Sequence, residues 1–162
     1  MVVDGTIKMK FALEINYPHH ETKNDAENLG EFEASEILKQ FNKMNWNQLQ
    51  ILQLQMQTGS TSFTVTNVET EQSLQIMLNE LSHKSHLEFL IDSDIEVDVQ
   101  KRNLFGLLKI KSKDYVAFRD IGLQSTVNCL TAFLNNDIET IIQEYQSGTA
   151  SQFATSSRAY NL

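Results

Sequence analysis

The stretch from Ser62 to Phe118 reads SFTVTNVETEQSLQIMLNELSHKSHLEFLIDSDIEVDVQKRNLFGLLKIKSKDYVAF. Apolar residues occupy every second position in three runs: Phe63 and Val65; Leu74, Ile76 and Leu78; and Leu87, Phe89, Ile91, Ile95, Val97 and Val99. This period of two is typical of β-strands with one buried face. The polar breaks at 69–72 and 81–86 are too short for helical crossovers, so the stretch predicts consecutive antiparallel strands, a meander.

The chain before this meander carries the patterns of one strand and one helix. Apolar and polar residues alternate from Ile7 to Ile15, which predicts a strand, and the polar, acidic segment 19–30 is expected to form a mobile connection. From Glu31 to Met44 the apolar residues fall at helical spacings. Trp46 follows directly, and we favour a role as an anchor between helix and sheet over a role at a binding surface.

The segment Trp46–Met56, WNQLQILQLQM, fits both a helix and a strand. We favour a strand over Ile51–Gln57, because glutamines alternate with apolar residues there. The sequence TGST then provides a turn into Ser62.

The chain after the meander predicts a closing helix. Residues 115–118 are expected to form a last short strand or to continue the previous strand beyond a bulge. Ser125 is a suitable N-cap, and apolar residues at spacings of three and four predict a helix that continues to Tyr145. A kink at Asn135 and Asn136 is left open.

The fold class that follows is α+β, with a single domain over residues 1–146. An antiparallel meander of about five or six strands is expected to pack against an N-terminal-half helix and a C-terminal helix, both on one face. Residues 147–162 lack periodicity and are expected to form a flexible polar tail, which could dock through Phe153 or Tyr160.

Composition limits the partner and the compartment. The chain has 162 residues and a net charge of -8, which argues against nucleic acid and favours a basic protein partner. No apolar run approaches the roughly 20 residues that a bilayer requires, and no secretory signal is visible. The single Cys129 cannot form an internal disulfide and is expected to be a small buried residue. We therefore expect a cytoplasmic protein; the oligomeric state is left open.

An acidic ladder in LIDSDIEVDVQ is the most informative local feature. Asp92, Asp94, Glu96 and Asp98 occupy every second position, so they line one face of a strand. An EF-hand calcium loop would need glycine and glutamate where this chain has Val97 and Asn103. We interpret the four carboxylates as a solvated face that a partner binds, in preference to a catalytic pair.

Lysines downstream of the ladder provide counter-charges at the same period. A hairpin across residues 101–104 would set Lys109, Lys111 and Lys113 opposite the acids. A two-residue loop pairs Glu96 with Lys109, Asp94 with Lys111 and Asp92 with Lys113; a four-residue loop pairs Asp94 with Lys109 and Asp92 with Lys111. The longer loop leaves Glu96 and Asp98 available to a partner.

No residue set predicts catalysis, a cofactor or a metal site. The adjacent histidines His19 and His20 point to opposite sides of an extended chain, and His83 and His86 lie in a predicted turn without nearby cysteines. The chain has no G-x-G-x-x-G, P-loop, G-x-S-x-G or C-x-x-C motif. We therefore expect a protein that is not an enzyme.

The order of elements resembles that of small bacterial immunity proteins, the inhibitors carried beside polymorphic or contact-dependent toxins. The resemblance covers most of 34–145 and lies in FNKMNW, SFTVTN, SLQIML, HLEFLID, LFGLLKIKSKDY and LTAFLNNDIETI. It implies a cytoplasmic, acidic binder that blocks a basic toxin domain and carries no catalytic motif. Two alternatives remain: an acidic secretion chaperone for an effector, which would be dimeric, and a curved-sheet domain that binds a small ligand or acts as an enzyme.

Overall fold

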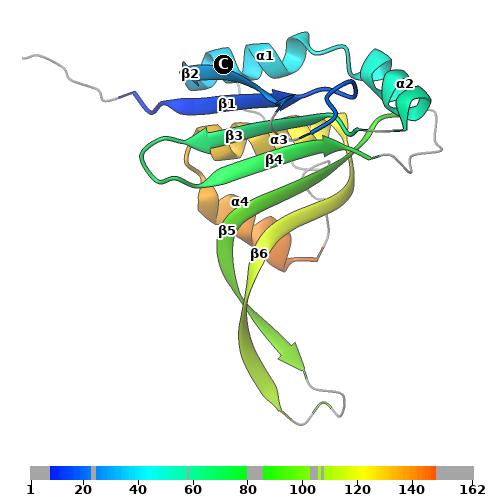
Figure 1. Cartoon of the computed structure of the whole chain (residues 1–162). Coiled ribbons are helices and arrows are strands. Elements are labelled where there is room, and N and C mark those ends of the chain that lie inside the picture. Colours follow the sequence, from blue (N-terminus) through cyan, green and yellow to red (C-terminus); the bar gives the residue numbers. More distant parts are fainter. Residues whose placement is uncertain are drawn as a thin grey trace, which may run out of the picture.

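A computed structural model describes residues 8–22, 25–57, 59–79, 86–102, 106 and 108–148. Its elements are β1 (Phe11–Asn16), β2 (Glu27–Phe32), α1 (Ala34–Lys43), α2 (Trp46–Met56), β3 (Ser62–Asn67), β4 (Ser73–Leu78), β5 (Glu88–Arg102), β6 (Lys109–Gly122), α3 (Leu123–Leu134) and α4 (Ile138–Gln146). The strands form one antiparallel sheet of six strands in the order β2-β1-β3-β4-β5-β6 (Figure 1). The predicted α+β class and meander are confirmed.

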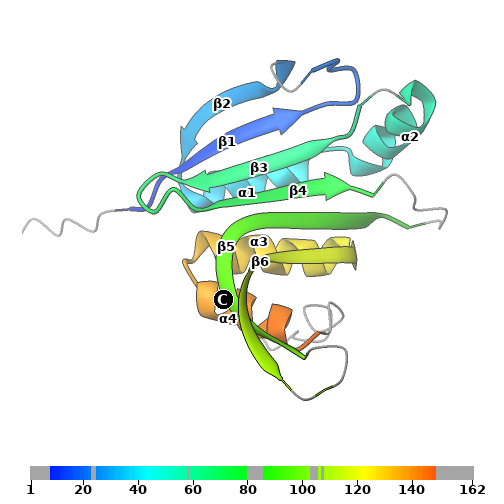
Figure 2. The same cartoon turned by 60° about the horizontal axis from the view of Figure 1, so that its bottom comes forward.

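One face of the sheet carries the core. The alternating apolar residues of all three predicted runs lie on this face, with Phe63, Ile76 and Phe89 fully buried. Figure 2 shows α1 and α3 together behind the sheet, and α4 lies against β6. The two predicted helical regions therefore cover the same face, because each presents an apolar stripe that the sheet buries.

Trp46 occupies the junction that the sequence predicts for it. The centroid of its ring lies 4.8 Å from that of Phe41 and 5.3 Å from that of Phe89. Its Nε1 donates to the carbonyl oxygen of Phe41 at 3.1 Å. The side chain thus joins α1 to the core, and its polar atom is satisfied.

Two predictions in the N-terminal half are wrong. The segment 19–30 contains most of β2, an edge strand whose alternation is interrupted by a bulge opposite Leu13 and Glu14. The segment Trp46–Met56 is a helix and not a strand over 51–57: the Asn45 side chain accepts from the Gln48 backbone N–H, and Gln57 ends the helix with a positive φ of 53°. Periodicity alone missed both, because neither element buries a regular apolar stripe.

The hairpin register also differs from both predicted versions. Strand β5 continues through Arg102, so Asp98 lies opposite Lys113, Gln100 opposite Lys111 and Arg102 opposite Lys109. The connection includes Gly106 with a φ of 69°, a conformation that glycine adopts without strain. The turn therefore comes later than predicted, and the two strands form an arm that extends beyond the rest of the sheet (Figure 1).

The C-terminal part contains two helices rather than one. Residues 115–118 continue β6, and α3 begins after Gly122, so Ser125 is a buried residue within the helix and not its N-cap. A left-handed residue, Asn136 with a φ of 57°, separates α3 from α4. The predictions for Ile7, for His83 and for tail residues 149–162, including Phe153 and Tyr160, lie outside the described residues.

Candidate functional site

The open face of the sheet, opposite the core, is the candidate site. Because side chains alternate along a strand, every core residue has neighbours that point to this second face. No helix of the described residues covers it (Figure 2). By register and alternation its central strands contribute Glu14, Thr64, Gln75, Asp92 and Asp94, so the face is polar, with carboxylates on either side of neutral residues.

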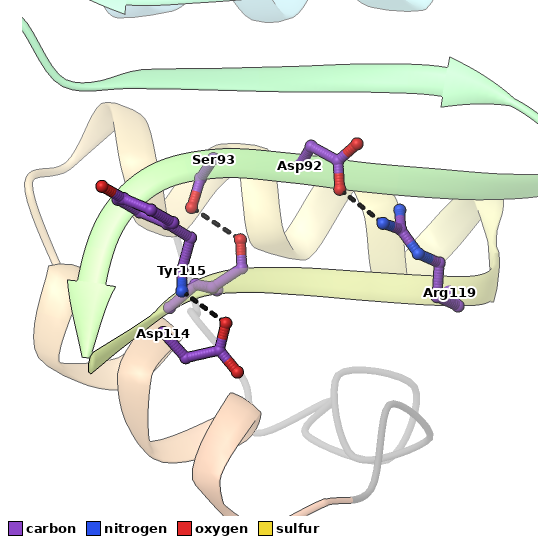
Figure 3. Close-up of polar contacts among 6 residues, drawn as sticks. Asp92, Ser93, Asp114, Tyr115 and Arg119 are labelled. Carbon is purple, nitrogen blue, oxygen red and sulfur yellow. Dashed lines mark hydrogen bonds and ion pairs between the residues drawn. The ribbon is translucent and has the colours of Figure 1, made fainter. Parts of the chain in front are cut away.

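A bulge divides the acidic ladder. Asp92 lies opposite Ala117 and Glu96 opposite Tyr115. Three residues of β5, 93–95, therefore lie opposite a single residue of β6, Val116. The Ser93 hydroxyl fills the gap: it donates to the Val116 carbonyl oxygen at 2.7 Å (Figure 3) and accepts from the Ile95 N–H at 3.3 Å. Strand β5 bends beside Ser93 (Figure 3), as bulged strands do. Asp92 and Asp94 therefore belong to the sheet, while Glu96 and Asp98 belong to the arm.

The two acids of the ladder that belong to the sheet, Asp92 and Asp94, each have a partner. Asp92 Oδ1 lies 2.7 Å from Arg119 Nη2 (Figure 3). The Asp94 carboxylate accepts from the Ser73 backbone N–H at 2.7 Å and from its hydroxyl at 2.8 Å. These contacts fix the orientation of the carboxylates without burying them, so their charges still face solvent.

The acids on the arm interact with Lys113. Glu96 Oε2 lies 3.0 Å from Lys113 Nζ, and Asp98 is its cross-strand neighbour. The hydrogen bond and the charge of Glu96, followed by the charge of Asp98, raise the pKa of Lys113 above its ordinary value. Lys109 and Lys111 precede Lys113 on β6 and lie closer to the tip of the arm, so the arm becomes basic beyond Asp98. None of the predicted pairs between the ladder and the lysines is formed: among the described residues Glu96 pairs with Lys113, and Asp92 pairs with Arg119.

A shallow trough of about 550 Å³ runs across the open face. It reaches from Glu14 on β1 to Asp92 and Asp94 on β5, with Thr64 and Gln75 between them. The Thr64 Oγ1 atom is enclosed and has no hydrogen-bond partner among the described residues. Asp92 and Asp94 were predicted to lie on one strand face, but their neighbours across the sheet were not; residues at the positions between the apolar ones, such as Glu14, Thr64 and Gln75, form the rest of the lining.

The remaining predicted candidates do not form a reactive site. The prediction that His19 and His20 point to opposite sides is wrong, because the chain turns here and their ring centroids lie 4.4 Å apart. His20 Nδ1 accepts from the Tyr17 N–H at 3.0 Å, and the ring of His19 stacks on that of Tyr17. His86 is exposed, near Glu88. Cys129 is buried in α3, and burial raises the pKa of its thiol to about 12. Within the described ranges, no three His, Cys, Asp or Glu residues are placed to hold a metal ion.

Comparisons with models of known families, with curated proteins and with solved structures found no match to this chain. Among the helices described, none has the length and apolarity needed to cross a bilayer. The geometry of the open face is therefore the basis for a functional proposal.

Proposed function

We propose that this protein is a non-catalytic, cytoplasmic inhibitor, an immunity protein that neutralises a basic toxin domain by occluding it. The observation that carries the proposal is the uncovered, acidic face of the sheet. A sheet face of this size without a covering layer is available to a partner, and its charge selects one of the opposite sign.

The acids are distributed so that a basic surface meets negative charge across the sheet. Glu14 lies on one side of the trough and Asp92 and Asp94 on the other, while Glu96 and Asp98 extend the acidic surface onto the base of the arm. Such complementarity accelerates encounter and fixes the docking register, whereas a few buried anchors provide most of the affinity. The ion pairs with Arg119 and Lys113 hold two carboxylates in place before binding.

The neighbouring genes test the class of protein. An upstream reading frame that ends in a Lys- and Arg-rich toxin-like domain agrees with the proposal. An effector gene in that position favours the secretion chaperone instead. Co-expression of the toxin domain with this protein should restore growth of a bacterial host.

Association kinetics test the surface. Reversing Glu96 and Asp98 together to Lys should slow association with the toxin domain and weaken its dependence on salt. The matched control reverses Glu69 and Glu139, two exposed acids away from the open face, and changes the net charge by the same amount. If both double variants associate at the wild-type rate at low and high ionic strength, Glu96 and Asp98 do not take part in docking; the open face itself is excluded only if reversal of Glu14 and Asp94 to Lys also leaves the rate unchanged.

One observation favours a second function, the binding of a small polar ligand in the trough. Its volume of about 550 Å³ lies within the range of ligand sites, and the carboxylates of Glu14, Asp92 and Asp94 line it. A ligand bound there would raise the melting temperature of the wild type more than that of Glu14→Gln. A screen of polyols and amines that gives no such shift would leave protein binding as the function of this face.

A further inference from the structure

Helix α2 is attached to the rest of the protein by few side chains. Trp46 and Gln53, two turns apart, are its buried residues. The apolar residues on the rest of its surface remain accessible: Ile51 is 55% exposed, Leu54 53%, Met56 40% and Leu52 37%. An accessible group of large apolar side chains on one helix indicates an interaction surface.

This helix is also free of charge. No charged residue occurs between Lys43 and Glu69, although 21% of the chain is charged. Two copies of a protein with a net charge of -8 repel each other, and they approach most easily where neither presents an acid. The helix itself carries no charge, and the groove that Gln48 and Leu52 line beside it contains one charge of each sign, Lys43 and Glu27. A second copy of α2 can therefore pack here without bringing two acidic surfaces together.

The outward side of α2 has the symmetry that a pair of identical helices needs. Gln48, Ile51, Leu52 and Gln55 follow the spacing i, i+3, i+4, i+7, so they form one stripe. The segment QLQILQLQ, residues 48–55, reads almost the same in both directions. In an antiparallel pair about a twofold axis, Ile51 would therefore meet Leu52 of the second copy, and Gln48 would meet Gln55. Each glutamine amide both donates and accepts hydrogen bonds, so these two side chains are complementary.

We propose that the protein forms a twofold-symmetric dimer in which the outward stripes of two α2 helices pack antiparallel. The inference does not depend on the proposed function, because it uses neither the acidic ladder nor the trough. The 11-residue helix is about 16 Å long and provides less than the roughly 800 Å² per partner of a standard interface. The dimer is accordingly weak.

Analytical ultracentrifugation of the full chain over a series of increasing concentrations tests the dimer. The wild type should pass from monomer to dimer, and added salt should favour the dimer because it screens the repulsion between acidic copies. Ile51→Lys should remain monomeric. Ile110→Lys is the matched control, since Ile110 is 53% exposed and lies on the arm; it should dimerise like the wild type.

A disulfide experiment tests the antiparallel geometry. A mixture of Gln48→Cys and Gln55→Cys proteins should form the mixed disulfide faster than either variant forms a disulfide with itself. Cys129 does not interfere, because it is buried. The proposal is overturned by a wild type that stays monomeric at the highest concentration, by a dimer that Ile51→Lys leaves intact, or by faster disulfides between like variants. Trp46 emission confirms that each variant is folded.

Discussion

The side chain of Gln53 holds α2 on the sheet, and its removal should destabilise the protein. Gln53 is 5% exposed. Its Oε1 accepts from the Thr61 backbone N–H at 2.8 Å, and its Nε2 donates to the Leu78 carbonyl oxygen at 3.3 Å. One amide thus links the helix to the start of β3 and to the end of β4.

The Gln53→Ala variant leaves the Thr61 N–H and the Leu78 carbonyl without this partner. Each buried polar group that loses its hydrogen bond destabilises the fold by about 1 to 3 kcal/mol. The higher helix propensity of alanine offsets a few tenths of a kcal/mol of this loss. We expect the free energy of unfolding to fall by about 2 to 4 kcal/mol. The matched control is Gln55→Ala, the same change at an exposed position of the same helix, which should stay within about 0.5 kcal/mol of the wild type.

Urea unfolding monitored by Trp46 emission measures both variants, since Trp46 is the one tryptophan of the chain and is buried beside Phe41 and Phe89. Equal unfolding free energies for Gln53→Ala and Gln55→Ala would refute the role of the amide.

Gln53→Glu adds a pH test. The introduced carboxylate can accept from the Thr61 N–H, but it faces the Leu78 oxygen without a proton, so folding raises the pKa of this carboxyl. A raised pKa contributes stability that is fully present below the unfolded value of about 4.3 and is lost as pH rises through the folded value. The deficit of this variant relative to the wild type should therefore be smaller at acidic than at neutral pH.

Two further predictions concern the core. Phe89→Ala and Leu134→Ala should each lower the free energy of unfolding by about 2 to 5 kcal/mol, because these side chains are 0% and 2% exposed; an unchanged melting temperature would contradict their placement. Burial raises the pKa of Cys129 to about 12, so the folded thiol keeps its proton above pH 9 while the unfolded thiol loses it. Stability should therefore fall by up to about 1.4 kcal/mol per pH unit above pH 9, and Cys129→Ala, measured by urea unfolding, should lack this component of the slope.

The parts of the fold that could be predicted from the sequence are those in which burial imposes a period. Strands β1, β3 and β4 and the first part of β5 place apolar residues in the core at every second position, so their alternation is regular and local. Strand β2 escaped prediction because an edge strand with a bulge shows no alternation. Helix α2 was predicted as a strand because a buried amide, and not an apolar stripe, holds it in place.

The candidate site was predictable in composition but not in geometry. The period of two placed Asp92 to Asp98 on one side of a strand, and their accessibility in β5 agrees with this. Their partners depend on the register of the hairpin. That register depends on the left-handed conformation of Gly106 and on the bulge that the Ser93 hydroxyl stabilises. A pattern of alternating residues contains no information about either. Arg119 was missed as the partner of Asp92 for the same reason.

The two proposed interactions should respond to salt in opposite directions, because one uses an acidic surface and the other an uncharged surface. Binding of a basic partner to the acidic open face draws on attraction between unlike charges, so screening slows it. Packing of two uncharged α2 helices works against the repulsion between two chains of charge -8, so screening strengthens it. A dimer is also expected of the secretion chaperone alternative, so the oligomeric state by itself does not decide the function. The Ile51→Lys monomer tests whether inhibition requires the dimer. If it inhibits the toxin domain as the wild type does, the open face acts alone, and the dimer is a separate property of the chain.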